Sequence, residues 1–251
     1  MSGRRLDRAV AERAGVSRAD AGRLCRSARV MVNGIVIRDG ATHVAPDAAL
    51  SLDGRGLDAR GPLTLLLHKP TGCVSATTDA LHPTVLDLVP AEVRRPGLAP
   101  AGRLDKDTTG LLILTEDGGL NHRLTHPRRH VPKTYDAILS QPLSSAAVNI
   151  VRHGMRLADG TELAPGLLLP LAASPDGTAR VRVLIREGQY HQVRRMVAAL
   201  GSHVTQLARV AIGCLALPDD LPPGAWRPAT EVDLGLAFTV PEVWREAGLD
   251  P

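Results

Sequence analysis

The sequence has little cysteine and no long hydrophobic run, and both shortages narrow what the protein can be. Its three cysteines, Cys25, Cys73 and Cys214, are far apart and show none of the paired spacings of zinc sites or disulfide frameworks. No stretch approaches the roughly 18 consecutive apolar residues of a membrane span, and residues 1–15 lack the apolar core of a signal peptide. We therefore expect reduced, structural cysteines in a cytoplasmic protein that does not associate with a membrane.

Lysine is also scarce, with only three residues, so arginine carries nearly all of the positive charge. Residues 1–60 hold 11 arginines and 7 acidic residues, whereas residues 61–251 hold 19 basic and 19 acidic residues. The net charge of +4 therefore comes entirely from the N-terminal part of the chain. A small basic segment joined to a larger neutral body is typical of a polyanion-binding module, although an ordinary solvated face gives the same excess.

The basic segment has the pattern of two helices followed by a hairpin. Apolar residues recur at helical spacing over residues 4–15 and again over residues 17–28. Asn33-Gly34 then stands between two β-branched runs, which is a strong hairpin signal. Four arginines on the second helix and its exit either clamp phosphates or form an ordinary charged face: Arg18, Arg23, Arg26 and Arg29.

A second, larger domain is expected after a linker. Residues 53–62 are rich in Gly and charge, which gives an N-terminal domain over residues 1–60 and a second domain over residues 61–251. Strands are expected at 63–69, 72–76, 110–116, 133–139, 166–173 and 179–187, and helices near 84–89, 118–125, 144–154 and 190–200. Strands outnumber helices without regular alternation, so the predicted class is α+β with a mainly antiparallel mixed sheet.

The segment PAGRLDKDTTGLLILTEDGGL, residues 100–120, is the first candidate for chemistry. It puts Arg103 and Asp105 in a glycine-containing loop just before a strongly apolar strand. A carboxylate close to an arginine is kept ionised, which suits a base or a nucleophile. A surface turn with a local ion pair explains the same residues, and the loop alone does not decide between the two.

Longer motifs add a family resemblance. GRLDKDTTGLLILTEDG at 102–118 is similar to the catalytic motif of the RsuA and related branch of ribosomal RNA pseudouridine synthases. KTY at 133–135 and EGQYHQVRRM at 187–196 resemble the second and third motifs of the same family, in the same order. Residues 68–85 and 201–230 also resemble it, and the N-terminal module resembles an S4-like RNA-binding domain. The resemblance covers nearly the whole chain.

This resemblance implies roles for individual residues. Asp105 would be the essential carboxylate, acting on the nucleoside as a nucleophile or on the ribose as a base. Tyr135 would stack on a uracil drawn out of the RNA, and Arg194 would pair with Asp105 and keep it charged. Further substrate-binding candidates are Arg103, Lys133, His191, Gln192 and Arg195. Gln189 departs from the family, which often has Arg there, and this puts one RNA contact in doubt.

The implied reaction is the isomerisation of one uridine in ribosomal RNA to pseudouridine, which requires neither metal nor cofactor. The motifs favour 16S RNA of the small subunit, either mature or in an assembly intermediate, and a monomeric enzyme. Two alternatives stay open: a synthase that acts on 23S RNA of the large subunit, and a non-catalytic ribosome assembly factor that only binds RNA. Intact Asp105, Tyr135 and Arg194 favour an enzyme, because a pure binder gains nothing from an ionised aspartate that faces phosphates.

Two unrelated kinds of site compete with this hypothesis. Asp105, Asp107 and Thr109 fit the DxDxT pattern of magnesium-dependent phosphatases, but that motif normally ends an apolar strand, whereas here the apolar strand follows it. A second pattern, His122, His126 and His130, has the spacing of metal ligands on one helical face. Pro127 interrupts that helix, so we expect histidines that face solvent or RNA instead.

Overall fold

The computed structural model describes residues 3–57, 61–174 and 176–249. The chain separates into two compact units, one formed by residues 1–63 with 90–98 and the other by residues 64–89 with 99–251. Part of the expected linker, residues 58–60, lies outside the described residues. The linker was expected to start at residue 53, but residues 55–57 form a strand of the first unit.

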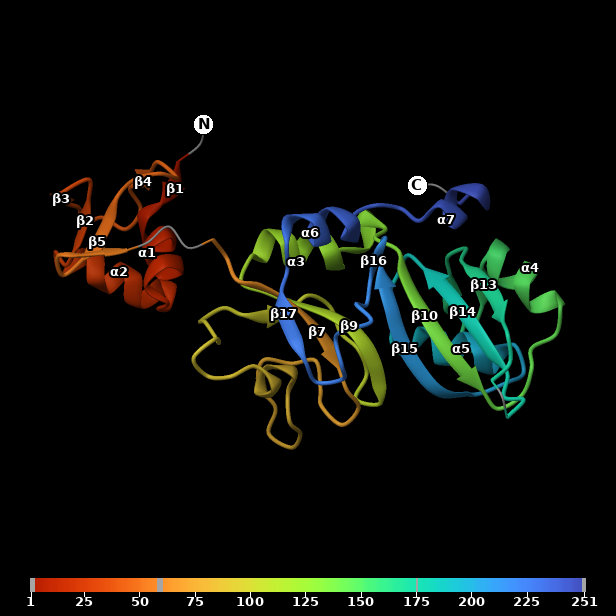
Figure 1. Ribbon diagram of the computed structural model, residues 1–251. Coiled ribbons are helices and arrows are strands. Elements are labelled where there is room, and N and C mark those ends of the chain that lie inside the picture. The colour runs from red at the N-terminus through yellow and green to blue at the C-terminus, as the bar shows by residue number, and fades with distance from the viewer. Residues whose placement is uncertain (1–2, 58–60, 175, 250–251) are drawn as a thin grey trace. The chain divides into compact units, whose positions relative to one another are not determined.

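The first unit contains two helices and two small sheets (Figure 1). Its elements are β1 (Arg4–Arg5), α1 (Leu6–Ala14), α2 (Arg18–Arg26), β2 (Val30–Val32), β3 (Ile35–Val36), β4 (His43–Val44), β5 (Leu50–Leu52) and β6 (Arg55–Leu57). Strand β1 pairs with β4, and the larger sheet has the order β3-β2-β5-β6. Residues of α1, α2 and three strands bury one shared core, in which Leu6, Val10 and Cys25 are fully inaccessible.

Local sequence explains the turns of this unit. The Ser17 hydroxyl accepts a hydrogen bond from the Asp20 amide at 3.1 Å and so caps α2. Asn33 and Gly34 have φ angles of +49° and +82°, the combination that a tight two-residue hairpin requires. The helix, helix and hairpin order predicted for this region is therefore correct.

The second unit is built on one nine-stranded sheet. Its main path runs β13 (Leu167–Leu171), β14 (Arg180–Ile185), β10 (Lys133–Leu139), β15 (Val204–Ile212), β9 (Thr108–Thr115), β7 (Thr64–Lys69) and β17 (Trp226–Pro228), side by side in Figure 1. Two short strands, β8 (Ala99–Pro100) and β16 (Leu215–Ala216), pair with β9 and β15. Every pair is antiparallel except β9 with β15, so the predicted α+β class with a mainly antiparallel sheet is confirmed.

Helices cover this sheet. They are η1 (Val85–Leu88), α3 (Gly118–Thr125), η2 (Pro127–Arg129), α4 (Ala146–His153), α5 (Gln192–Ala199), α6 (Glu231–Ala237) and α7 (Glu242–Glu246). Leucines of β7 and β9 are fully buried on both faces of the sheet, and α3 and α6 contribute to the core beside them. A separate hairpin pairs β11 (Met155–Arg156) with β12 (Glu162–Leu163).

Two sequence predictions for this unit fail. The strand expected at residues 72–76 is absent, and Val74 makes only an isolated bridge to Thr84, because this segment instead supports the loop described below. The longest strand, β15, was not predicted as a strand at all. It joins β10 on one side to β9 on the other, and this connection between the two halves of the sheet forms the site.

Candidate active site

Residues 102–108, which we call the catalytic loop, are fixed from inside the protein by Lys69. The Lys69 side chain is fully buried, and its Nζ donates to the backbone carbonyls of Asp105 and Thr108 at 2.9 Å each. Nζ also donates to the carbonyl of Pro70 at 3.0 Å. The pKa of the Lys69 ammonium is lowered, because burial has a larger effect than the nearby Asp107 and Asp105 carboxylates, which act in the opposite direction. The HKP segment therefore serves to hold the catalytic loop in shape.

Ser75 supports the same loop from the segment that was expected to be a strand. Its hydroxyl donates to the Leu104 carbonyl at 2.9 Å and lies 3.0 Å from the Leu104 amide that donates to it. The Gly72 amide donates to the Lys106 carbonyl at 2.8 Å. These bonds tie the backbone of the loop at Leu104 and Lys106, on either side of Asp105.

Asp105 lies at the centre of the catalytic loop with its side chain 31% exposed. One carboxylate oxygen is 3.5 Å from Nε2 of His191, the residue that precedes helix α5. Asp105 is therefore accessible to a ligand and has an imidazole as its nearest polar neighbour.

The predicted pairing of Arg194 with Asp105 is not what the structure contains. Nη2 of Arg194 lies 2.8 Å from the carboxylate of Asp107, and Nη1 donates to the Val204 carbonyl at 3.1 Å. Val204 begins β15, and the parallel partner strand β9 begins immediately after Asp107. The guanidinium is thereby held at the start of both strands, where Asp107 is the carboxylate within reach.

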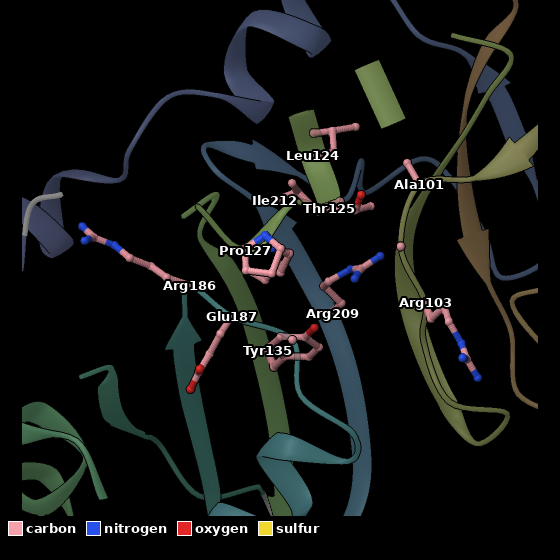
Figure 2. Close-up of a pocket in the computed structure, with 13 residues that line it drawn as sticks. Ala101, Arg103, Leu124, Thr125, Pro127, Tyr135, Arg186, Glu187, Arg209 and Ile212 are labelled. Carbon is pink, nitrogen blue, oxygen red and sulfur yellow. The ribbon is translucent and has the colours of Figure 1, made fainter. Parts of the chain in front are cut away.

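A pocket of about 250 Å³ opens beside the catalytic loop (Figure 2). The residues that matter most to its chemistry are Arg103, Leu124, Lys133, Tyr135, Glu187 and Arg209. Figure 2 shows Tyr135 and Arg209 next to each other on neighbouring strands, with Arg103 across from them on the loop. Asp105 follows Arg103 by two residues on the same loop, but it is not among the residues that line this pocket.

Three strand residues set the character of this pocket. Tyr135 and Arg209 are direct partners in the register of β10 and β15, and both are more than nine-tenths buried. Arg209 Nε donates to the Leu111 carbonyl at 2.8 Å, but its buried Nη2 has no hydrogen-bond partner among the described residues. Burial lowers the pKa of Lys133 to about 8, and the nearby Arg209 charge contributes to the lowering. The pocket therefore combines a flat ring with two positively charged groups that favour an anionic ligand.

Two other predicted substrate-binding residues, Gln192 and Arg195, instead make hydrogen bonds and ion pairs within the protein. Gln192 is buried. Its side-chain Nε2 donates to the Glu187 carboxylate at 2.6 Å, and its Oε1 accepts from the backbone amide of Gln189 at 3.0 Å. Arg195 pairs with Asp159 and donates to the Thr161 hydroxyl at 3.0 Å. Both side chains are already occupied within the protein, so the structure gives them a shaping role, with Gln192 no longer a candidate for direct substrate contact.

Sequence reasoning missed Lys69 and Arg209. Lys69 stands in the HKP motif that carried part of the family resemblance, yet its burial could not be read from the sequence. Arg209 could have been noticed as a charged residue within the β-branched run of residues 204–212, where one arginine interrupts an apolar pattern. A charge in a strand that is otherwise buried is expected to have a specific partner.

The arginines of the first unit form a surface with mixed pairing. Arg18 lies 3.2 Å from Asp7, Arg23 pairs with Asp20, and Arg29 makes a two-pronged bond to Asp53. Arg26 is exposed and has no carboxylate partner within the ranges described. These ion pairs are largely exposed and hence weak, so a phosphate can compete for the guanidinium groups.

The predicted absence of a metal site and of a membrane span can be compared with the described part of the chain. Within residues 3–57, 61–174 and 176–249, no three His, Cys, Asp or Glu side chains are grouped as a metal site needs. Over the same ranges, no helix has both the length and the apolar character to cross a membrane. The rings of His122 and His126 lie with their centroids 4.6 Å apart at the end of α3.

Comparison with known proteins agrees with the motifs. A family model described as RNA pseudouridylate synthase matches residues 64–199. The chain is 42% identical over 231 residues to the ribosomal small subunit pseudouridine synthase A of Escherichia coli strain K12, covering 92% of this chain and 98% of that protein. It is 37% identical over 233 residues to the uncharacterized RNA pseudouridine synthase YtzG of Bacillus subtilis strain 168, covering 92% and 97%.

A solved structure is similar as well. The crystal structure of a pseudouridylate synthase matches with a TM-score of 0.64 and 33% sequence identity, covering 93% of this chain and 99% of that one. The match spans both the N-terminal residues and the nine-stranded sheet, since it leaves only a small part of either chain outside.

Proposed function

The chain belongs to the RNA pseudouridylate synthase family, and we propose that it isomerises a uridine of 16S ribosomal RNA with Asp105 as its catalytic carboxylate. The observation that carries this proposal is the pocket beside the catalytic loop, which is lined by Tyr135, by Arg209 with its unpartnered Nη2, and by Arg103, two residues before Asp105. The choice of small-subunit RNA is supported by the name of the Escherichia coli relative, which shares 42% of its residues with this chain.

The reaction breaks the bond from uracil N1 to ribose C1′, turns the ring, and joins C5 to the same carbon. N1 gains a proton and C5 gives one up, so substrate and product have the same composition. Asp105 acts at the ribose, either by attack on C1′ or by removal of a proton, and both routes need it ionised. Arg103 and Lys133 supply positive charge to the neighbouring pocket, which they both line.

The detached uracil carries the electron pair of the broken bond, so its ring oxygens become negatively charged. Arg209 donates from Nη2 to one of these oxygens, and the Lys133 ammonium adds a second positive charge. Tyr135 stacks against the ring, which keeps uracil in the pocket while it turns. The chain's own residues thus supply a carboxylate, a cationic cradle and an aromatic wall.

The first unit is proposed to be an S4-like RNA-binding domain that holds the ribosomal RNA while one uridine leaves the stack. Drawing a base out costs a few kcal/mol, and phosphate contacts elsewhere on the RNA offset that cost. The order of two helices and a hairpin, with Arg18, Arg23, Arg26 and Arg29 along α2 and its exit, supports this role. We propose that the protein acts as a monomer, in the cytoplasm, where ribosomal RNA is found.

The test is to map pseudouridines in 16S and 23S RNA by carbodiimide probing, in cells with and without this protein and with the Asp105→Asn variant. One 16S position is expected to lose its modification without the protein and with Asp105→Asn, while the RNA affinity of the purified variant stays within a few-fold. The matched variant Asp107→Asn is expected to retain measurable activity, because Asp107 pairs with Arg194 rather than serving the ribose.

Each other result has a definite meaning. A lost position in 23S RNA would overturn the small-subunit substrate, and no lost position in either RNA would overturn the enzymatic role. Substantial activity of Asp105→Asn would overturn the assignment of the carboxylate.

A further inference from the structure

Tyr190 is an exposed aromatic side chain in a protein that has very few aromatics. The chain contains two Tyr, two Trp and one Phe, and one of its two tyrosines is the pocket residue Tyr135. Tyr190 is 74% exposed, the only aromatic among the large apolar side chains that are exposed in the described part of the chain. Both tyrosines therefore belong to the region around Asp105, one inside the pocket and one on the surface.

The Tyr190 ring is stacked on His191, and His191 reaches the candidate carboxylate. The two ring centroids are 3.9 Å apart with 15° between the planes. Nε2 of His191 lies 3.5 Å from Asp105. One face of the Tyr190 ring is thus covered by the imidazole, and the large exposed fraction requires the opposite face to be open to solvent.

The backbone that carries this stack is held in an unusual conformation. His191 has a φ angle of +49°, a left-handed conformation that is unfavourable for a residue other than glycine. Neighbouring side chains enforce it: Arg195 Nη1 donates to the Tyr190 carbonyl at 3.4 Å, and Gln192 ties the Gln189 amide to Glu187. Strain that is enforced in this way accumulates at functional positions, whereas an incidental surface tyrosine needs no such support.

A nucleobase is the ligand that this surface fits. Base–aromatic stacking requires an open, flat ring and is tolerant of sequence because every base has a π-face. When a uridine is flipped out of the RNA helix, the flanking base loses its stacking partner, and one of its faces becomes available for stacking. The open face of Tyr190 lies one ring away from Asp105, because the imidazole of His191 is the layer between them in this stack.

We propose that Tyr190 is a stacking platform for a base that flanks the isomerised uridine, with His191 as the second layer that sets this base beside Asp105. This inference rests on the proposed function, because it takes the reacting uridine to be at Asp105. It gives the motif EGQYHQVRRM a contact with the substrate that the pocket alone does not supply.

The experiment uses the full chain and an RNA oligonucleotide that carries the uridine identified by mapping, with 2-aminopurine at each flanking position in turn. Fluorescence is measured in the Asp105→Asn background so that binding is followed without turnover. The wild-type Tyr190 ring is expected to quench one flanking 2-aminopurine, and Tyr190→Ala is expected to abolish that quenching. Tyr190→Ala is also expected to weaken RNA binding by about 5- to 150-fold, the effect of removing one base–aromatic stack.

Two comparisons separate stacking from a structural effect. Tyr190→Phe keeps the ring and is expected to recover the quenching and most of the affinity. Val232→Ala removes another exposed apolar side chain, on α6, and is expected to change neither. The slope of affinity against salt should be the same for wild type and Tyr190→Ala, since stacking involves no phosphate contact.

The proposal is overturned if quenching and affinity survive Tyr190→Ala, or if the loss of affinity comes with a reduced salt slope. Failure of the proposed function is seen separately, because the wild-type protein would then form no pseudouridine whatever the fluorescence shows. Quenching that depends on Tyr190 without turnover would retain the platform and reject the enzyme.

Discussion

The guanidinium of Arg209 uses only part of its hydrogen-bonding capacity within the protein. Nε is bonded to the Leu111 carbonyl, which fixes the direction of the group, and Nη2 is left without a partner among the described residues. An unpaired buried donor costs free energy of folding, about 1 to 3 kcal/mol for a typical group, and is retained where a ligand completes it. Under the proposed function, this ligand is the uracil ring as it becomes negatively charged.

Arg209→Gln is therefore expected to lower kcat by about 10²- to 10³-fold, as the removal of one donor to developing negative charge does in other active sites. RNA affinity should change little, because phosphate contacts dominate it. Single-turnover rates of pseudouridine formation and thermal unfolding, measured on the same preparation, give the two quantities. Arg209→Lys, which keeps the charge, is expected to fall between wild type and Gln.

The control for Arg209 is Arg182→Gln. Arg182 also lies on a strand of the sheet, where it makes a two-pronged bond to Asp136, and it does not line the pocket. Its replacement should affect stability rather than kcat. A folded Arg209→Gln protein with a wild-type rate would show that the unpaired donor has no part in the reaction.

At the residue scale, the sequence predicted which side chains gather but not how they pair. Arg103, Lys133 and Tyr135 line one pocket, whereas Asp105 is not among its lining residues. The partner of Arg194 was predicted wrongly, because Asp105 and Asp107 are two residues apart and only the alignment of β9 with β15 decides which one the guanidinium meets. The role of Arg209 depends on the same alignment, so its local sequence could mark it as an unusual charge but could not reveal its partner.

Strands β9 and β15 approach each other at a glycine. Gly110 is aligned with Arg209 and has a φ angle of +111°. A Cβ atom at Gly110 would lie 2.2 Å from the Arg209 carbonyl oxygen, which is backbone and cannot move aside cheaply. The absence of a side chain at Gly110 is thus a condition for Arg209 to reach the pocket.

Gly110→Ala is expected to lower the free energy of unfolding by at least about 1 to 3 kcal/mol from backbone strain alone, with the clash adding to it. Urea unfolding followed by circular dichroism measures this change. Gly118→Ala is the matched control, because Gly118 starts α3 with open space around its Cβ position, and it should be neutral or stabilising by up to about 1 kcal/mol. Equal effects of the two substitutions would contradict the close approach of the strands.

At the element scale, periodicity found the helices up to α5 and several local strands, but it missed α6 and α7. The expected segments 118–125 and 133–139 coincide with α3 and β10, because a capping Asp117 and an apolar strand pattern are both local signals. Residues 72–76 were mistaken for a strand, since their bonding partners are in the catalytic loop and not in a neighbouring strand. Strand β15 escaped notice because Arg209 and several short side chains mask its apolar pattern.

For the whole molecule, charge is divided unevenly between the two units. The excess of arginine lies in residues 1–60, and most of the arginines on α2 are in exposed ion pairs that release readily. Replacing Arg18, Arg23 and Arg26 together by Ala should weaken RNA binding and reduce the salt slope by about one unit for each phosphate that the variant no longer binds. Binding isotherms measured over a series of salt concentrations give both effects.

Arg245→Ala serves as the control for the loss of an exposed arginine elsewhere, because Arg245 lies on α7 of the second unit. It should leave the slope as in wild type. A triple variant with an unchanged slope would remove the first unit from RNA recognition. Of the three arginines, Arg26 should have the largest single effect, because it has no carboxylate to give up within the described residues.

The hydrogen bond between Leu111 and Arg209 joins positions that are 98 residues apart, and it determines when the enzyme can first exist during its own synthesis. Translation passes residue 111 several seconds before residue 209, at about 5 to 20 residues per second. The loop with Asp105 is synthesised before strand β15, which carries Arg209. The hydrogen bond between Leu111 and Arg209 cannot form until then, and contacts of such long sequence separation form slowly. A nascent chain released before β15 would therefore have its basic N-terminal unit and no uracil pocket, an RNA binder that cannot yet modify RNA.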